Sequence, residues 1–166
     1  MIKFRPINNE EKEVLKTLGG EFEVDIEQVF RDKTILVGEG KRKEVFITNK
    51  ATNKQLNRMQ GMPYFAGLYI GDIKGKKFLL GLEGANIISK YSNKKVVVDK
   101  KAEQLVLYGR DIFSKSVRHL YKEADVGDRI LIVNENNECL GIGALDKGEV
   151  LVENIMDRGW YLRKGE

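Results

Sequence analysis

Residues 96–117 read VVVDKKAEQLVLYGRDIFSKSV, and this stretch decides the fold of the second half of the chain. Three consecutive valines are typical of a buried strand. The segment AEQLVLYG that follows Lys101 has the apolar spacing of a short helix, which Gly109 is expected to end. The segment DIFSKSV then predicts a strand or a loop. Strand-rich segments around one inserted helix indicate a small, partly closed β-barrel.

The residues that follow this stretch extend the strand-rich pattern. Residues 128–145, DRILIVNENNECLGIGAL, predict a hairpin whose turn falls at Asn134–Asn137. The segments EVLVENI and GWYLR predict two more strands. The polar segment SNKK, Ser92–Lys95, precedes the valines, so we place a domain boundary there, between residues 1–93 and 94–166.

Upstream of the boundary, residues 1–93 predict an α+β domain with an antiparallel sheet. A first helix in NNEEKEVLKTLGG is expected to be capped by Asn8 or Asn9 and to end at Gly19-Gly20. Further helices are predicted in EVDIEQVFRD, NKATNKQLNRM and EGANIISKY. One hairpin is predicted in KTILVGEGKRKEVFITNK around Gly38 and Gly40. A second pairs Phe65–Ile70 with Phe78–Leu82, with Gly71, Asp72 and Gly75 near the turn.

Charge is unevenly distributed along the chain, whose net charge is +4. Residues 94–122 carry eight Lys and Arg against three Asp and Glu, a net charge of +5. Residues 123–166 carry five against ten, a net charge of −5. If the fold keeps these segments apart, one face is positive and suits a polyanionic partner.

Composition also restricts the location and the chemistry. No apolar run approaches the roughly 20 residues that span a bilayer, and the N-terminus shows no apolar signal region, so we expect a cytoplasmic protein without a membrane partner. The single cysteine, Cys139, excludes an internal disulfide and is predicted to be a buried, inert thiol. With one histidine, His119, and one cysteine, a zinc site is not expected.

Two lysine-rich segments invite comparison with phosphate-binding loops. GEGKRKE, residues 38–44, and GDIKGKK, residues 71–77, lack the required spacer and the hydroxyl residue after the lysine. We therefore interpret both as glycine-bearing turns with solvated lysines. No acid/base pair is assembled either, so the sequence predicts no enzyme, no catalytic residue, no metal and no cofactor.

Residues 95–166 resemble a PUA domain, a small RNA-binding pseudo-barrel. The resemblance rests on VVVD before the helix, GRDIF after it, then GDRILIV and LGIG. AEQLVLYG further resembles the small pre-ribosomal PUA proteins, the archaeal counterparts of a eukaryotic large-subunit (60S) ribosome biogenesis factor. FRPINNEEKEVL, EVFITNKATNKQL and GDIKGKKFLLGLEGANIISKY extend this resemblance over nearly the whole chain.

The resemblance implies a two-domain, non-catalytic RNA-binding protein with a C-terminal PUA-type mixed pseudo-β-barrel. It implies a role in pre-rRNA processing, with other ribosome assembly proteins binding residues 1–93. The alternative is an RNA-guiding subunit or relic of an enzyme that modifies tRNA or rRNA bases. A module for protein interaction alone is a third possibility.

The chain departs from many PUA domains at Lys101, where glycine is common, at Ser114–Ser116, and in a short connection after Ala144 whose single cation is Lys147. These departures shift the expected contacts with single-stranded or irregular RNA toward the helix. Tyr108 can stack on a base, although its apolar run favours core packing, which we also expect for Trp160. The candidate RNA-binding residues are Lys101, Tyr108, Gly109, Arg110, Lys115, Arg118, Lys147, Arg158 and Arg163, with Arg110, Lys115 and Arg118 expected to share one rim.

Overall fold

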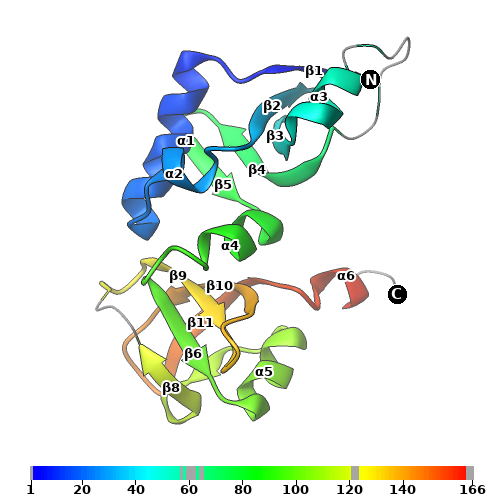
Figure 1. Cartoon of the computed structure of the whole chain (residues 1–166). Helices are drawn as coiled ribbons and strands as arrows, with labels where there is room; N and C mark the ends of the chain where they lie inside the picture. The colour runs from blue at the N-terminus through cyan, green and yellow to red at the C-terminus, as the bar shows by residue number, and fades with distance from the viewer. Residues whose placement is uncertain (1, 57, 59–62, 64–65, 121–123, 164–166) are drawn as a thin grey trace. The chain divides into compact units, whose positions relative to one another are not determined.

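The computed structural model describes residues 2–56, 58, 63, 66–120 and 124–163, which belong to two compact units (Figure 1). The first unit is Met1–Gly84 and the second is Ala85–Glu166. The division falls inside a helix, α4, Leu82–Ile88. The domain boundary expected after residue 93 stays a prediction. In the described part of the chain, no helix is both long and apolar enough to cross a membrane.

The first unit contains a five-stranded antiparallel sheet, which confirms the fold class predicted for this half. Its strands follow the order β1-β2-β3-β4-β5 in space as well as in sequence, because every connection joins neighbours. Their bounds are Lys3–Pro6 (β1), Thr34–Glu39 (β2), Lys43–Thr48 (β3), Leu68–Lys74 (β4) and Lys77–Leu80 (β5).

The turn of the second hairpin contains Gly75, as predicted, but Gly71 and Asp72 belong to a strand. Strand β4 continues through Gly71 and Asp72 to Lys74, and the turn is Gly75–Lys76. Gly71 has a φ of +153°, and a Cβ there would overlap the carbonyl oxygen of Leu79. This glycine therefore permits a close approach to β5 instead of forming the turn. Phe65, the expected start of β4, lies outside the described residues.

Three helices besides α4 complete the first unit: α1, Asn9–Phe22; α2, Ile26–Val29; and α3, Lys50–Leu56. Asn8 caps α1 together with Glu11. The end predicted at Gly19-Gly20 was wrong, because the helix continues to Phe22 and Glu23 takes the left-handed conformation, with φ of 55°. Gly19 serves packing: its Cβ would lie 2.7 Å from the carbonyl oxygen of Val24.

The second unit is a nearly closed mixed barrel, which confirms the predicted fold class. Its strand order is β7-β11-β10-β9-β6-β8, and β6 pairs in parallel with β9 whereas the other pairs are antiparallel. The bounds are Lys95–Val98 (β6), Ile112–Phe113 (β7), Val117–Leu120 (β8), Arg129–Val133 (β9), Cys139–Leu145 (β10) and Val150–Asp157 (β11). Helix α5 is Lys100–Leu107, a 3-10 turn spans Ser114–Ser116, and α6 is Trp160–Arg163.

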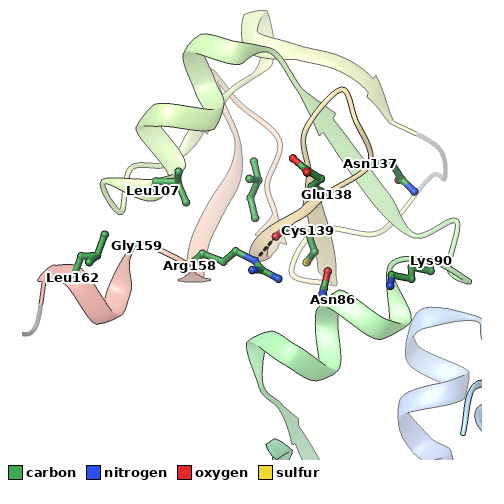
Figure 2. Close-up of a pocket in the computed structure, with 10 residues that line it drawn as sticks. Asn86, Lys90, Leu107, Asn137, Glu138, Cys139, Arg158, Gly159 and Leu162 are labelled. Carbon is green, nitrogen blue, oxygen red and sulfur yellow. Dashed lines mark hydrogen bonds between the residues drawn. The ribbon is translucent and has the colours of Figure 1, made fainter. Parts of the chain in front are cut away.

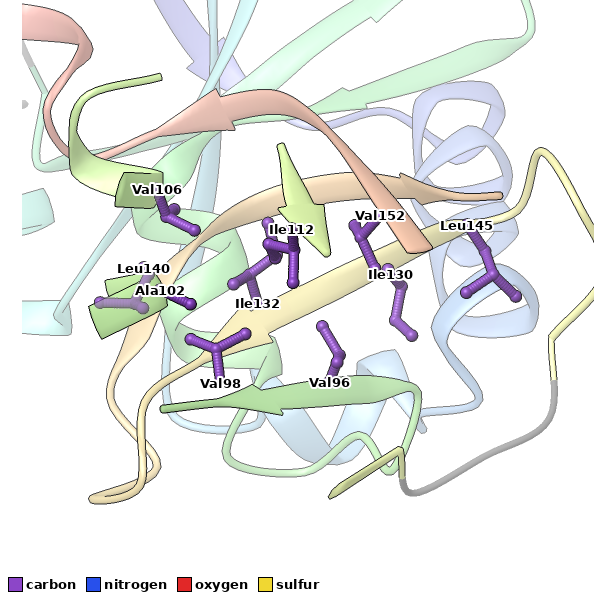
Figure 3. Close-up of a cluster of buried hydrophobic side chains, with 10 residues drawn as sticks. All are labelled: Val96, Val98, Ala102, Val106, Ile112, Ile130, Ile132, Leu140, Leu145 and Val152. Carbon is purple, nitrogen blue, oxygen red and sulfur yellow. The ribbon is translucent and has the colours of Figure 1, made fainter. Parts of the chain in front are cut away.

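One hydrophobic core fills this barrel. Its side chains come from β6, α5, β7, β9, β10 and β11 and point toward one another (Figure 3). Cys139 is also buried, as predicted. The core members are Val96, Val98, Ala102, Val106, Ile112, Ile130, Ile132, Leu140, Leu145 and Val152.

The segment GWYLR was predicted as a strand but forms helix α6. The backbone N–H groups of Leu162 and Arg163 both bond to the carbonyl oxygen of Gly159, at 3.1 and 3.2 Å. Trp160 is 40% exposed and Leu162 is 83% exposed, so the expectation that Trp160 packs in the core was wrong. Aromatic residues favour strands only where a sheet neighbour covers them.

Candidate functional site

The site is built around the C-terminal end of α5. Asp99 caps the helix by accepting a hydrogen bond from the N–H of Ala102 at 2.8 Å, while Ala102 and Val106 bury the inner face. Gly109 has a φ of +77°, and the N–H of Arg110 bonds to the carbonyl oxygen of Leu105 at 2.9 Å. This closure is common where a left-handed glycine ends a helix, so the predicted helix end is confirmed.

Gly109 also makes room for a neighbouring side chain. A Cβ at this position would lie 2.9 Å from Nη2 of Arg163. The structure fills this space with a guanidinium group of the same chain. The contact of Gly109 with RNA, expected from the sequence, stays a prediction.

Arg163 joins α6 to α5 and β11. Its guanidinium donates to both carboxylate oxygens of Asp157, at 3.0 and 2.8 Å, and to the carbonyl oxygen of Leu107. The Asp157 side chain is buried, and this hydrogen bonding raises the pKa of Arg163 above its usual value. Arg163 therefore holds α6 in place, and its contact with RNA stays a prediction.

The loop after α5 is fixed from the other side by Asn154 of β11. Its side-chain amide donates to the carbonyl oxygens of Val106 and Arg110, at 3.1 and 3.2 Å. Its backbone N–H donates to the carboxylate of Asp111 at 2.9 Å. Within this rigid frame Tyr108 is 72% exposed, so the interpretation of Tyr108 as a core residue was wrong.

A pocket of about 550 Å³ lies next to this helix end (Figure 2). Arg158 directs its guanidinium toward the pocket while Nε donates to the carbonyl oxygen of Cys139 at 2.7 Å. We call Tyr108, Arg110 and the pocket residues Leu107, Arg158 and Leu162 the α5–α6 surface. The other lining residues are Asn86, Lys90, Asn137, Glu138, Cys139, Leu140 and Gly159.

A buried lysine holds the α4 wall of this pocket. Nζ of Lys95 donates to the carbonyl oxygen of Ser89 at 3.0 Å and to Oδ1 of Asn137 at 2.9 Å. Burial lowers the pKa of this ammonium group. Lys95 thus connects the end of α4 to the β9–β10 turn.

The remaining predicted residues lie on other segments. Arg118, in β8, is near the opposite end of α5, 4.0 Å from the carboxylate of Asp99 and 3.8 Å from that of Glu135. Lys115 lies 5.8 Å from the ring centroid of Phe113. Lys101 is exposed in the first turn of α5, and Lys147 is exposed between β10 and β11. The structure therefore brings Tyr108, Gly109, Arg110 and Arg163 together, and places Lys115 and Arg118 apart from them.

The acidic last third of the chain does not stay separate from the basic segment. Lys94 pairs with Asp128 at 3.1 Å, and Arg118 with Glu135. The expected segregation of charge along the sequence is therefore partly neutralised in space. Among the described residues, no group of three His, Cys, Asp or Glu side chains is placed to hold a metal ion.

The sequence missed Asn154, Lys90 and Leu162 as parts of this site. Asn154 lies in β11 between the exposed Glu153 and Ile155, on the same face as the buried Val152, and no local pattern indicates its contacts with the loop after α5. Leu162 was assigned to a strand, and Lys90 to the other domain. Their roles depend on which segments meet in space.

Gly159 offers a test of how α6 is held. A Cβ there would overlap the carbonyl oxygen of Leu107, so Gly159→Ala is expected to lower the free energy of unfolding of the second unit by about 1–3 kcal/mol. Trp160, the single tryptophan, should report the displaced helix by a red-shifted emission. Gly148→Ala is the control, because its Cβ would meet nothing nearer than 3.8 Å. Equal unfolding midpoints for both variants would contradict this packing.

The fold and this site define a PUA-domain protein, and comparisons agree. The UPF0113 PUA domain matches residues 94–166, and the NIP7/UPF0113 pre-PUA domain matches residues 4–82. A UPF0113 protein of Archaeoglobus fulgidus is 35% identical over 141 residues, 78% of each chain. One from Aeropyrum pernix is 29% identical, over 80% of this chain and 75% of its own. The chain belongs to the UPF0113 family.

A solved structure resembles nearly the whole chain in fold, and an enzyme resembles part of it in sequence. A conserved PUA domain protein of Thermoplasma acidophilum has the same fold, with a TM-score of 0.65 at 14% identity over 98% of this chain and 99% of its own. A tRNA-guanine(15) transglycosylase of Pyrococcus furiosus is 38% identical over 90 residues, which are 52% of this chain and 15% of that enzyme.

Proposed function

We propose that this protein is a non-catalytic RNA-binding protein that holds single-stranded or irregular RNA on its α5–α6 surface. The observation that carries the proposal is Tyr108, which is 72% exposed at the end of a helix fixed on two sides. A large aromatic ring kept in water by a rigid frame suits stacking on an unpaired base. Arg110, exposed two residues later, would contact the adjoining phosphate.

The biological setting that we propose is maturation of the large ribosomal subunit in the cytoplasm, with pre-rRNA as the RNA. This setting rests on the resemblance of the sequence to the archaeal counterparts of a large-subunit ribosome biogenesis factor. Residues 1–93 would then contact other assembly proteins. The PUA fold supports RNA binding in general, because PUA domains generally bind RNA.

A second candidate role follows from the transglycosylase similarity. An enzyme that acts on tRNA carries a segment similar to part of this chain, so the chain could guide RNA to a separate catalytic protein. The two roles differ in the bound RNA. Cross-linking in cells followed by sequencing would recover pre-rRNA for an assembly factor and tRNA for a guiding subunit.

The expected test result concerns Tyr108 and Arg110 separately. Tyr108→Ala should weaken binding of a labelled uridine-rich RNA by roughly 1–3 kcal/mol and leave the salt dependence unchanged. Arg110→Ala should weaken binding and reduce the log–log salt slope by about 0.7, the value for one phosphate contact on a single strand. Fluorescence anisotropy at several salt concentrations measures both quantities.

Tyr91→Ala is the matched control, since Tyr91 is also in the second unit and is 51% exposed. It should bind RNA like the unmodified protein. If Tyr108→Ala and Tyr91→Ala both bind like the unmodified protein, the α5–α6 surface is not where RNA stacks.

A further inference from the structure

Two lysine-rich turns that are distant in sequence meet in the first unit. They are the segments 38–44 and 71–77, each of which fails as a phosphate-binding loop by itself. Strand β3 pairs with β4, with Lys43 opposite Ile73, so the β2–β3 turn and the β4–β5 turn lie at the same end of the sheet. Together they line a pocket of about 630 Å³. We call it the two-turn pocket; its lining residues are Gly40, Lys41, Arg42, Lys43, Asp72, Ile73, Lys74, Gly75 and Leu79.

The cations of this pocket outnumber its carboxylates. Its single acid, Asp72, is buried, accepts a hydrogen bond from the hydroxyl of Tyr69 at 3.0 Å, and lies 3.7 Å from Arg42. Lys43 donates to Glu11 at 3.1 Å. Two cations are thus partly neutralised from within the unit.

Four more lysines at this end are not neutralised. Within the described part of the chain, none of them has a carboxylate in ion-pair range. All are exposed: Lys41 in one turn, and Lys74, Lys76 and Lys77 in the other. A cluster of unpaired cations around a hollow focuses positive potential there.

The strand register gives a second observation in favour of an anion site. Lys74 and Lys77 lie directly opposite each other in the β4–β5 ladder. Like charges in this position destabilise a sheet. An anion bound between the two turns would relieve this repulsion, which gives the pocket a differential affinity for anions.

The spacing favours an extended anion. The two turns are separated by about two strand spacings, roughly 10 Å, which is wider than one phosphate group. Leu79 adds an apolar side chain that is 43% exposed at the pocket. Cations in two rows beside an apolar surface suit a chain of phosphates that carries flat bases.

We infer that the two-turn pocket is a second binding site, in the first unit, for the phosphate backbone of RNA. The choice of RNA over another polyanion rests on the proposed function. The site itself rests on the convergence of the two turns and not on the α5–α6 surface.

The test compares two triple variants of the full chain with the same change in net charge. Lys41→Gln, Lys74→Gln and Lys76→Gln remove three exposed cations of the two turns: Lys41 and Lys74 line the pocket, and Lys76 follows the lining residue Gly75. Lys12→Gln, Lys33→Gln and Lys54→Gln remove three exposed lysines elsewhere in the same unit. Both variants are titrated with a labelled uridine-rich RNA of about 30 nucleotides at several salt concentrations. Each lost phosphate contact should reduce the log–log salt slope of RNA binding by roughly 0.7, so the pocket variant should reduce it by about 2. The control variant should reduce the slope by less than about 0.5.

The outcomes separate this inference from the proposed function. If Tyr108→Ala weakens RNA binding while both triple variants give equal slopes, the two-turn pocket is not an RNA site and the α5–α6 surface stands. If the pocket variant loses RNA affinity while Tyr108→Ala and the control triple variant keep it, the two-turn pocket binds RNA and the α5–α6 surface does not. If the pocket variant keeps its RNA affinity but loses binding to polyglutamate, the pocket takes acidic protein and the inference is wrong.

Site-specific photo-cross-linking provides a readout that is independent of charge. A benzophenone amino acid at Leu79 should cross-link to RNA. The same group at Leu68 should not, since Leu68 is equally exposed, at 42%, but lies at the opposite end of β4, about 20 Å from Lys74. Equal cross-linking at both positions, or none at Leu79, would overturn the inference.

Discussion

Replacing Phe46 with alanine is expected to lower the free energy of unfolding of the first unit by about 3–5 kcal/mol, the usual range for deleting a buried phenylalanine. Phe46 lies in the central strand β3 and is 1% exposed. Its ring packs edge-on against Phe4 at 5.3 Å and Tyr69 at 5.7 Å between centroids. Alanine would lose both aromatic contacts and leave a cavity between β1, β3 and β4.

Urea unfolding followed by far-UV circular dichroism would measure this loss. Leu68→Ala is the control in the same sheet, and it should change the free energy of unfolding by less than about 0.5 kcal/mol because Leu68 is already 42% exposed. The emission of Trp160 reports the second unit, so it distinguishes loss of one unit from loss of both. Equal midpoints for the Phe46 and Leu68 variants would show that β3 is not the centre of this core.

Local patterns predicted most elements of both sheets. The β2–β3 hairpin, the helix α5 with its glycine end, and the β9–β10 turn at Asn134–Asn137 all form where the sequence placed them. Each is specified by neighbours in sequence: alternating β-branched residues, a capping aspartate, or a turn of asparagines. These predictions are confirmed because the contacts that specify each element are made within that element.

The errors arose where a residue serves a distant segment. Gly19 carries the signal of a helix end, yet its lack of a side chain lets Val24 approach. The aromatic segment GWYLR resembles a strand, yet the ion pair of Arg163 with Asp157 and the contact of Gly159 with Leu107 stabilise a helix. Neither partner can be identified from local sequence alone.

The candidate site was predicted in part for the same reason. Tyr108 sits in an apolar run, but the run winds around the end of a helix, so that only Val106 of it is fully buried. Arg110, Lys115 and Arg118 are close in sequence, but Arg110 follows the end of α5, Lys115 lies in a 3-10 turn, and Arg118 lies in β8 beside Asp99 at the start of α5. The two-turn pocket escaped notice because its halves are about thirty residues apart and meet only through the β3–β4 pairing.

Acid is expected to destabilise the first unit through Glu11, which gives the second large effect. The Glu11 side chain is 4% exposed and accepts hydrogen bonds from Arg5 at 2.8 and 2.7 Å, from the N–H of Asn8 at 3.1 Å and from Lys43 at 3.1 Å. Led by Arg5, these bonds outweigh the cost of burial and lower the pKa of Glu11 from 4.5 to about 2.

Because the folded state has the lower pKa, the stabilisation by Glu11 is complete above pH 4.5 and is lost as the pH falls toward 2. A shift of this size corresponds to about 3 kcal/mol. Glu11→Gln should therefore be less stable than the unmodified protein by about that amount at pH 7, and the difference should vanish near pH 2. Glu13→Gln, on the exposed face of the same helix, should show a difference below about 0.5 kcal/mol at every pH. Urea unfolding between pH 2 and pH 7 measures the free energy of unfolding of all three proteins. If the difference in this free energy between Glu11→Gln and the unmodified protein stays constant with pH, Glu11 is not the acid-sensitive group.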